Sequence, residues 1–287
     1  MITEDTGYLK YCKLSFGMSR EVTRHYSTSF YSATQLFPSP VREAIHGIYG
    51  FVRLADEIVD SFHGCDQKIL LDRFEADYYF ALEQGVSSNP VINSFLLTVN
   101  RYGIDDAYVR AFLASMRADL EKKIYTTRLE TEWYIYGSAD VVGLMCLRVF
   151  CDHDEQLFGE LVMPAMRLGS AFQKVNFLRD LRHDVLELGR IYFPVFSLEH
   201  FNEQTKLELV DDIKADFAEA LKGIRRLPDN SRLAVHTAYR YYVRLLDKIR
   251  ETPACELISR RIRIPNAEKF RLLSGAVLKH KLHMQII

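Results

Sequence analysis

Helical periodicity constrains this chain more than any other feature of its sequence. Apolar residues recur at three- and four-residue steps along almost all of its 287 residues, as in Val41, Ile45 and Ile48, and this is the period of an amphipathic helix. Alternating strand-like runs are nearly absent, with residues 262–264 as the one short candidate. Glycine (14) and proline (8) are scarce, which disfavours turn-rich sandwiches and barrels. The sequence therefore predicts an all-α fold.

The helical pattern has breaks but no domain boundary. Helices are expected over residues 19–33, 41–60, 66–84, 89–101, 105–120, 138–150, 154–188, 203–227, 231–251 and 266–285. Gly85, Gly103, Gly189 and residues 227–230 interrupt the pattern between them. No repeat, low-complexity tract or long linker separates one part from another, and the length suffices to bury a substantial core. We therefore expect residues 1–287 to form a single all-α domain.

Charge and cysteine usage limit the partners and the compartment. The 37 Lys and Arg nearly balance the 38 Asp and Glu, for a formal net charge of −1, so the chain lacks the general positive field of a nucleic-acid binder. The five cysteines are dispersed, without a C-x-x-C pair, which fits reduced thiols. No apolar signal segment opens the sequence, and no apolar run reaches the roughly 18–20 residues of a membrane span. We expect a cytoplasmic protein that contacts a membrane, if at all, from outside.

The C-terminal segment differs from the rest in charge. Residues 259–287 carry seven Lys and Arg against one acid, Glu268. Apolar residues such as Leu272, Ala276 and Val277 make residues 266–287 amphipathic. Two interpretations stay open: a helix that binds the surface of a membrane peripherally, or a helix that packs on the body of the protein with a solvated basic face.

Two acidic lines carry the clearest chemical signal. At about 100° per residue, one predicted helix brings four polar groups into an arc of roughly 60°: Tyr49, Arg53, Asp56 and Asp60. On a second helix an arc of roughly 80° holds another four: Gln173, Asn176, Asp180 and Asp184. The rest of each helix is mostly apolar, so both should be largely buried, and buried like charges repel unless something neutralises them.

A divalent cation would neutralise these charges directly. Asp and Asn oxygens are hard ligands that suit Mg²⁺ or Mn²⁺ better than zinc, and Mg²⁺ is usually held by one or two carboxylates together with substrate phosphates. Two such lines facing each other across a cavity, with Arg and Tyr beside them, would bind a metal–diphosphate complex. The alternative is that acids four residues apart simply face water. No P-loop and no dinucleotide-binding fingerprint occurs, so NADPH is not expected.

Five blocks, taken in order along the chain, resemble the squalene/phytoene synthases, which are head-to-head prenyl synthases. They are HYSTSF at 25–30, residues 49–60, YIYG at 134–137 with VGLM at 142–145, residues 169–184, and RIYFP at 190–194. The resemblance extends from about residue 24 to about residue 262 and is strongest to the bacterial phytoene synthases. It implies an all-α isoprenoid-synthase fold around a deep central cavity.

The same resemblance implies a Mg²⁺-dependent prenyltransferase. The expected reaction joins two geranylgeranyl diphosphates through prephytoene diphosphate to 15-cis-phytoene, in carotenoid biosynthesis. One alternative within the class is squalene or dehydrosqualene synthesis from two farnesyl diphosphates, and another enzyme alternative is cyclisation of a single prenyl diphosphate. An alternative from another class is a non-catalytic helical assembly factor of the same family, which would be expected to lose carboxylates that are present here.

The resemblance also implies roles for individual residues. It places the metal ligands at Asp56, Asp60, Asn176, Asp180 and Asp184. It places the substrate contacts at Tyr26, Ser27, Ser29, Tyr49, Arg53, Gln173, Arg179 and Tyr242, and the catalytic set at Asp56, Asp60, Asp180, Asp184, Tyr49 and Arg53. Tyr26 stands where many relatives have histidine, and Asp140 where they usually have glycine. Ser27 and Ser29 also suit helix capping.

Overall fold

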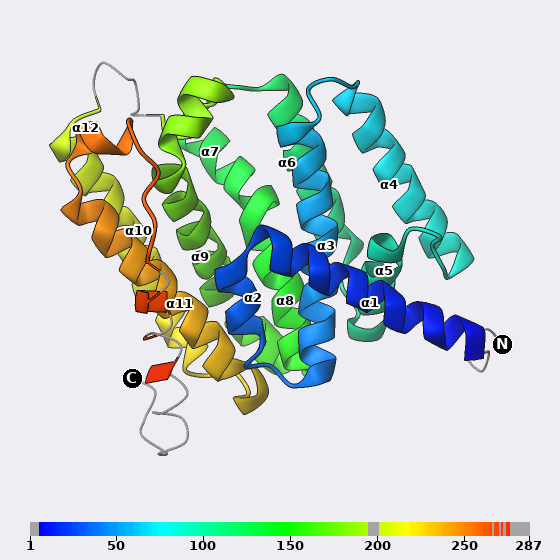
Figure 1. Ribbon diagram of the computed structural model, residues 1–287. Helices are drawn as coiled ribbons and strands as arrows, with labels where there is room; N and C mark the ends of the chain where they lie inside the picture. The colour runs from blue at the N-terminus through cyan, green and yellow to red at the C-terminus, as the bar shows by residue number, and fades with distance from the viewer. Residues whose placement is uncertain (1–5, 195–200, 266, 270, 272–273, 276–287) are drawn as a thin grey trace.

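The structure is a computed structural model that describes residues 6–194, 201–265, 267–269, 271 and 274–275 (Figure 1). Its helices are α1 (Thr6–Tyr26), α2 (Thr28–Thr34), α3 (Ser39–Ser61), α4 (Gln67–Gln84), α5 (Pro90–Tyr102), α6 (Asp106–Glu121), α7 (Arg128–Ile135), α8 (Val141–Cys151), α9 (Glu155–Arg179), α10 (Glu203–Ile224), α11 (Asp229–Glu251) and α12 (Ala254–Leu257). Two π-helical turns, η1 (Tyr136–Asp140) and η2 (His183–Glu187), extend α7 and follow α9. The all-α prediction is confirmed.

Side chains at the helix starts explain most of the boundaries. Asp66 accepts a hydrogen bond from the Ile69 amide at 3.0 Å, and Asp154 accepts one from the Leu157 amide at 2.9 Å. Such caps satisfy amides that have no partner within the helix. Gly85 and Gly103 end α4 and α5 with positive φ angles, which glycine adopts without strain. These boundaries lie within two residues of the predicted ones.

The first helix was not predicted before residue 19, because its buried face is not apolar. Ser15, Ser19 and Thr23 are fully buried, whereas Leu14 is 54% exposed. Ser19 Oγ lies 2.7 Å from Ser94 Oγ, and a Cβ on Gly50 would lie 2.7 Å from Ser19 Oγ. Small side chains thus let α1 pack closely on α3 and α5. A search for apolar periodicity does not detect such a helix.

Other sequence expectations also differ from the structure. The helix expected over 19–33 is divided at Ser27 into α1 and α2, and α7 was not expected. The helix expected over 154–188 ends at Arg179 and resumes as a π turn at His183, a local change that apolar spacing does not register. Residues 262–264 form no strand, and the bridge between Ile124 and Ile191 is the one β-type pairing within the described residues. The helix expected over 266–285 lies mostly outside the described residues.

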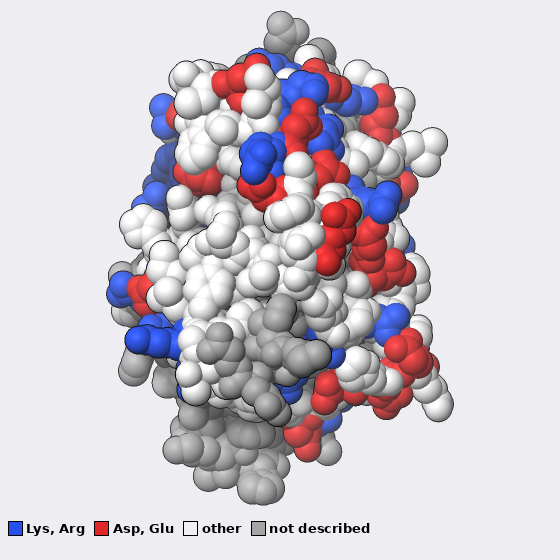
Figure 2. All heavy atoms as spheres, turned by 90° about the vertical axis from the view of Figure 1, so that its right-hand side faces the viewer, with Lys and Arg blue, Asp and Glu red and all other residues white. Residues whose placement is uncertain are grey.

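The arrangement of the helices places the two acidic lines at one end of the molecule. α8 packs beside α9, α9 beside α10, and α3 beside α5, α6 and α8. α3 and α9 both run toward the upper edge in Figure 1, so their C-terminal halves lie at the same end. The segment Arg128–Cys151 is long and apolar enough to cross a membrane, but most of it is buried in the fold. On the face shown in Figure 2, charges of both signs are interspersed around an uncharged middle.

Candidate active site

A large cavity connects the acidic lines to an apolar interior. Its volume is about 1010 Å³, at the upper end of the range for small-molecule sites. The acidic lines form its polar end. The other end is lined by apolar side chains from the opposite ends of the same helices, from α8, α10 and α11, and from the segments before α3 and α11: Phe37, Ile45, Phe150, Leu161, Ile224, Leu227 and Val235. A polar head above a deep apolar chamber suits a ligand with a charged group and a long hydrocarbon tail.

The first acidic line lies on α3 and faces the cavity along its whole length. Tyr49, Arg53, Asp56 and Asp60 all line the wall, as predicted. The Arg53 guanidinium pairs with Asp56 and Glu57. Burial, with the nearby Asp60 charge, raises the pKa of Asp56 to about 7, although 32% of its side chain is exposed, because that exposure is to the cavity. Burial likewise raises the pKa of Tyr49 to about 12.

The second acidic line also reaches the cavity, despite the break in the helix. Gln173 and Asn176 project from α9, Asp180 follows its last residue, and Asp184 lies in η2; all four line the wall. Burial raises the pKa of Asp184 to about 8, and the charges of Asp180 and Asp60 add to the shift. Asp60 of the first line and Asp184 of the second border the same cavity, so the two lines meet at its polar end.

Most of the residues assigned through the resemblance lie at the same polar end. Tyr26 lines the cavity beneath the Arg53 guanidinium, whose carbon is 4.3 Å from the ring centroid. Tyr242 donates to Asn176 Oδ1 at 3.3 Å. Arg179 lines the cavity and reaches around to Asp180, with its Nη2 2.5 Å from Asp180 Oδ2.

The two serines differ from each other. Ser27 lines the cavity and also caps α2, because its Oγ accepts from the Phe30 amide at 3.3 Å. Ser29 lies within α2 and is not part of the cavity wall, so the structure does not bring it together with the other residues assigned to the substrate. Asp140 does not face the cavity either; it is buried in η1, where its Oδ1 accepts from Ser170 Oγ at 2.8 Å.

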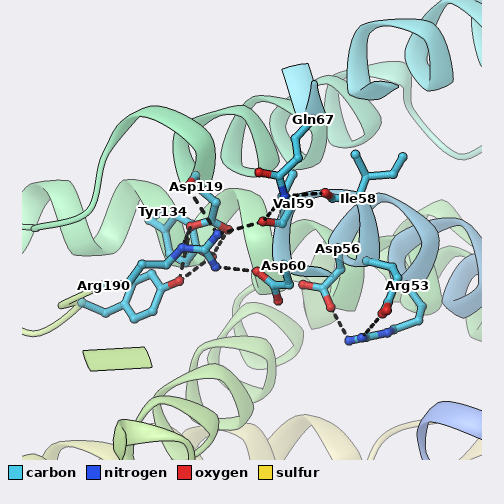
Figure 3. Close-up of polar contacts among 11 residues, drawn as sticks. Arg53, Asp56, Ile58, Val59, Asp60, Gln67, Asp119, Tyr134 and Arg190 are labelled. Atoms are coloured by element: carbon cyan, nitrogen blue, oxygen red, sulfur yellow. Dashed lines mark hydrogen bonds and ion pairs between the residues drawn. The ribbon is translucent and has the colours of Figure 1, made fainter. Parts of the chain in front are cut away.

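Sequence reasoning missed an arginine–carboxylate network behind the first line (Figure 3). Arg190 Nη1 donates to Asp60 Oδ1 at 2.5 Å. Asp119, from α6, accepts from the Tyr134 hydroxyl at 2.7 Å and from the Tyr192 hydroxyl at 3.3 Å. Burial raises the pKa of Asp119 to about 7, while Arg190 and Tyr134 oppose that rise. One signal was present in the sequence: Asp119 continues the apolar face of its predicted helix.

Part of the basic tail also belongs to the site. Arg261 Nε lies 2.6 Å from Asp180 Oδ1, and Arg263 lines the cavity. Farther along, Glu268 Oε1 accepts from Arg244 Nε of α11 at 2.6 Å. The described part of the tail therefore packs on the body of the protein, whereas most of residues 266–287, which the two interpretations concern, lie outside the described residues.

The donor set fits a divalent cation that arrives with substrate. Within the described residues, no three His, Cys, Asp or Glu side chains converge closely enough to hold an ion by themselves. Asp60, Asp180 and Asp184 nevertheless gather hard oxygen donors around one end of the cavity. Mg²⁺ commonly takes only one or two carboxylates and completes its shell with water and phosphate oxygens. The residues present match that requirement.

Comparison with known proteins decides the family. A family model described as squalene/phytoene synthase matches residues 23–268. The chain belongs to the squalene/phytoene synthase family. Members of this family are head-to-head prenyltransferases that act on prenyl diphosphates, so the resemblance seen in the sequence is confirmed.

Individual relatives agree with this assignment. A phytoene synthase from Arthrospira platensis is 30% identical, with 93% of this chain and 94% of the relative covered. A 15-cis-phytoene synthase from Synechocystis sp. is 32% identical, with 92% and 85% covered. A presqualene diphosphate synthase from Sinorhizobium fredii is 33% identical over 60% of each chain.

Solved structures confirm the isoprenoid-synthase helical fold of the family. A dehydrosqualene synthase in complex with a ligand superimposes with a TM-score of 0.79 at 22% identity, covering 96% of this chain and 99% of the other. A squalene synthase from Alicyclobacillus acidocaldarius has a TM-score of 0.73 at 23% identity, covering 84% and 94%. At these identities the likeness concerns the fold alone.

Proposed function

We propose that this family member is a phytoene synthase, which condenses two geranylgeranyl diphosphates through prephytoene diphosphate to 15-cis-phytoene. The observation that carries the proposal is the geometry of the site: two acidic lines meet at the head of one deep apolar cavity. The relatives named phytoene synthase, similar over more than nine-tenths of this chain, favour the C20 substrate. The second candidate is squalene or dehydrosqualene synthesis from farnesyl diphosphate. It is supported by the fold that this chain shares with the solved dehydrosqualene and squalene synthases.

The acids and arginines at the polar end are paired with one another. Arg53 pairs with Asp56, Arg190 with Asp60, and Asp180 with both Arg179 and Arg261. Arg190 is buried and keeps its contact with Asp60. A metal-bound diphosphate carries charges of both signs, so it can replace both partners of the pairs that Arg53, Arg179 and Arg261 make. The arginine donors then turn to phosphate oxygens, which they match in geometry.

The metal would be held by the carboxylate lines. Mg²⁺, or Mn²⁺, when bound by Asp56, Asp60, Asn176, Asp180 and Asp184, would supply positive charge that stabilises the departing diphosphate. The protein's own contribution to the allylic cation is to keep water away from it. Apolar walls exclude water, and ring faces such as that of Phe172, which lines the cavity and stacks on Tyr242 at 3.9 Å, attract positive charge.

Product analysis tests the proposal. Purified protein with geranylgeranyl diphosphate and Mg²⁺ is expected to form a C40 hydrocarbon, detected by mass, and EDTA is expected to abolish it until Mg²⁺ is added back. Farnesyl diphosphate should be offered in parallel at the same concentration. Undiminished product in EDTA would refute the metal requirement. Preference for the C15 substrate would support squalene-type synthesis, and no product from either would support the assembly-factor alternative.

A substitution at the apolar end should change the preferred chain length. Tyr242 contacts Asn176 at the polar end, and Ala234 lines the cavity about two turns earlier in α11, or ~12 Å deeper at 1.5 Å per residue. Ala234→Phe should block a longer tail more than a shorter one. We expect the ratio of kcat/KM for the C20 substrate to that for the C15 substrate to fall about tenfold or more.

The control for this prediction is one turn closer to the polar end. Ala238 also lines the cavity, so Ala238→Phe should obstruct both tails and lower both rates without a comparable change in their ratio. Because the prediction concerns a ratio, a general loss of stability from the larger side chain does not affect it. An unchanged ratio for Ala234→Phe would contradict the placement of the tail.

A further inference from the structure

Asp119 is a buried carboxylate that joins three elements behind the first acidic line. Asp119 as a whole residue is 5% exposed. It belongs to α6, and its two carboxylate oxygens accept from Tyr134 of α7 at 2.7 Å and from Tyr192 at 3.3 Å. Its backbone carbonyl accepts from Arg190 Nη2 at 3.3 Å. Asp119 therefore ties together α6, α7 and the segment that carries Arg190 and Tyr192.

Arg190 is held on several sides at once. Its side chain is 7% exposed. Besides the contact with the Asp119 carbonyl, Nη2 donates to the Val59 carbonyl at 3.2 Å, and Nε lies 3.9 Å from Asp119 Oδ1. A guanidinium presents its N–H donors in a rigid planar fork. Contacts along both edges of that fork fix where Nη1 points, and Nη1 points to Asp60 (Figure 3).

The end of α3 that carries Asp60 is held in place by a side chain at the start of α4. Gln67 Nε2 donates to the carbonyls of Ile58 at 2.8 Å and Val59 at 3.1 Å. These are carbonyls of the last turn, which have no amide partner within a helix. Arg190 thus meets a fixed helix end and engages Asp60 through one oxygen, Oδ1. Since Asp60 lines the cavity, the second carboxylate oxygen is the one available to a ligand.

We propose that Asp119 is a positioning residue: it fixes Arg190, and through Arg190 it orients the Asp60 carboxylate toward metal-bound diphosphate. This inference rests on the proposed function, because it assigns Asp60 to the metal site. Asp119 borders the cavity, but its side chain is only 2% exposed and its two carboxylate oxygens accept from Tyr134 and Tyr192. A role through Arg190 is therefore distinct from direct contact with a ligand. Partners that orient a ligating carboxylate typically change metal affinity 10–100-fold when they are replaced.

The test measures binding rather than turnover. Calorimetric titration of inorganic pyrophosphate in the presence of Mg²⁺ gives Kd for the full chain and for Asp119→Asn, which keeps the shape and loses the charge. We expect Kd to rise about tenfold or more. A matched control is Asp216→Asn, because Asp216 is also buried and paired, with Lys174 Nζ at 2.7 Å, but does not line the cavity. Its Kd should stay within about twofold of the unsubstituted protein.

A double-mutant cycle separates positioning from a merely structural role. If Asp119 acts through Asp60, then Asp119→Asn should cost little further affinity in a protein that already carries Asp60→Asn. An unchanged Kd for Asp119→Asn alone, or fully additive losses in the double variant, would overturn the inference. Absence of Mg²⁺–pyrophosphate binding by the unsubstituted protein would overturn the proposed function as well. Should Asp119→Asn not fold, Tyr192→Phe removes one of its hydrogen bonds and should show a smaller effect with the same dependence on Asp60.

Discussion

Replacing Asp184 by Asn is expected to lower kcat about 10²–10³-fold while making the metal-free protein more stable at pH 8. Asp184 lies at the mouth of the cavity near Asp60, where a carboxylate can act on a bound cation. Loss of one such electrostatic group from a water-poor site has effects of this size. The experiment is steady-state kinetics with saturating Mg²⁺, together with thermal unfolding in the absence of metal.

The stability effect follows from the direction of the pKa shift. Burial and the charges of Asp180 and Asp60 raise the pKa of Asp184 to about 8, above its ordinary value near 4. A group whose pKa is raised on folding favours the folded state at low pH and loses that contribution as the pH rises through the folded pKa. The native protein should therefore lose stability between about pH 4 and pH 8, and the Asn variant should lose less.

Glu83 provides the control, since it is an exposed acid on α4 and no residue of that helix lines the cavity. Glu83→Gln should leave both kcat and the thermal stability of the metal-free protein close to those of the native protein. If Asp184→Asn retained full activity, the second acidic line would not be part of the reaction site. If it were less stable than the native protein at pH 8, the assignment of Asp184 as a destabilising buried charge would be wrong.

Gly137→Ala is expected to lower the free energy of unfolding by about 2–3 kcal/mol and to reduce activity with it. A Cβ at residue 137 would lie 2.6 Å from the Ala111 carbonyl oxygen and 2.8 Å from Ser115 Cβ, both on α6. Because the Ala111 carbonyl belongs to the backbone of α6, it cannot move away from this Cβ unless α6 or η1 shifts as a whole. Because Gly137 lies in η1 next to Ser138 and Ala139 of the cavity wall, the shift should also deform the chamber.

Gly159→Ala is the matched control. Gly159 is an exposed position within α9, and a Cβ there would meet nothing within 4 Å. Alanine should stabilise the protein by roughly 0.5–1 kcal/mol, because glycine costs more conformational entropy in a helix interior. Denaturant unfolding of the two variants measures both changes. Equal effects at the two sites would show that the crossing of α6 and η1 is less tight than described.

Much of the site could be predicted because both acidic lines are local features. Asp56 and Asp60 share one helix face, and so do Gln173 and Asn176, so the helical repeat alone aligned them correctly. The second line was aligned on a continuous helix, which is wrong beyond Arg179. Asp184 still reaches the cavity because its amide donates to the Asp180 carbonyl at 3.0 Å, so it lies one α-helical turn after Asp180.

The network of Asp119 and Arg190 was not predicted because its members are distant in sequence. Arg190 meets Asp60 across 130 positions of the chain, and Tyr192 meets Asp119 across 73. No local repeat encodes such a pairing. The absence of Ser29 from the cavity wall has the same origin, since the packing of α2 decides which of its two neighbouring serines faces inward.

The sequence by itself determined the helical class, most helix boundaries and the composition of each acidic line, because these depend on interactions between residues a few positions apart. Only the tertiary structure decided that the two lines meet over an apolar chamber and that Arg261 turns back to Asp180. It also decided that α1 is buried through a face of small polar side chains. These features depend on how whole helices pack, and packing is set by the shapes of many side chains at once.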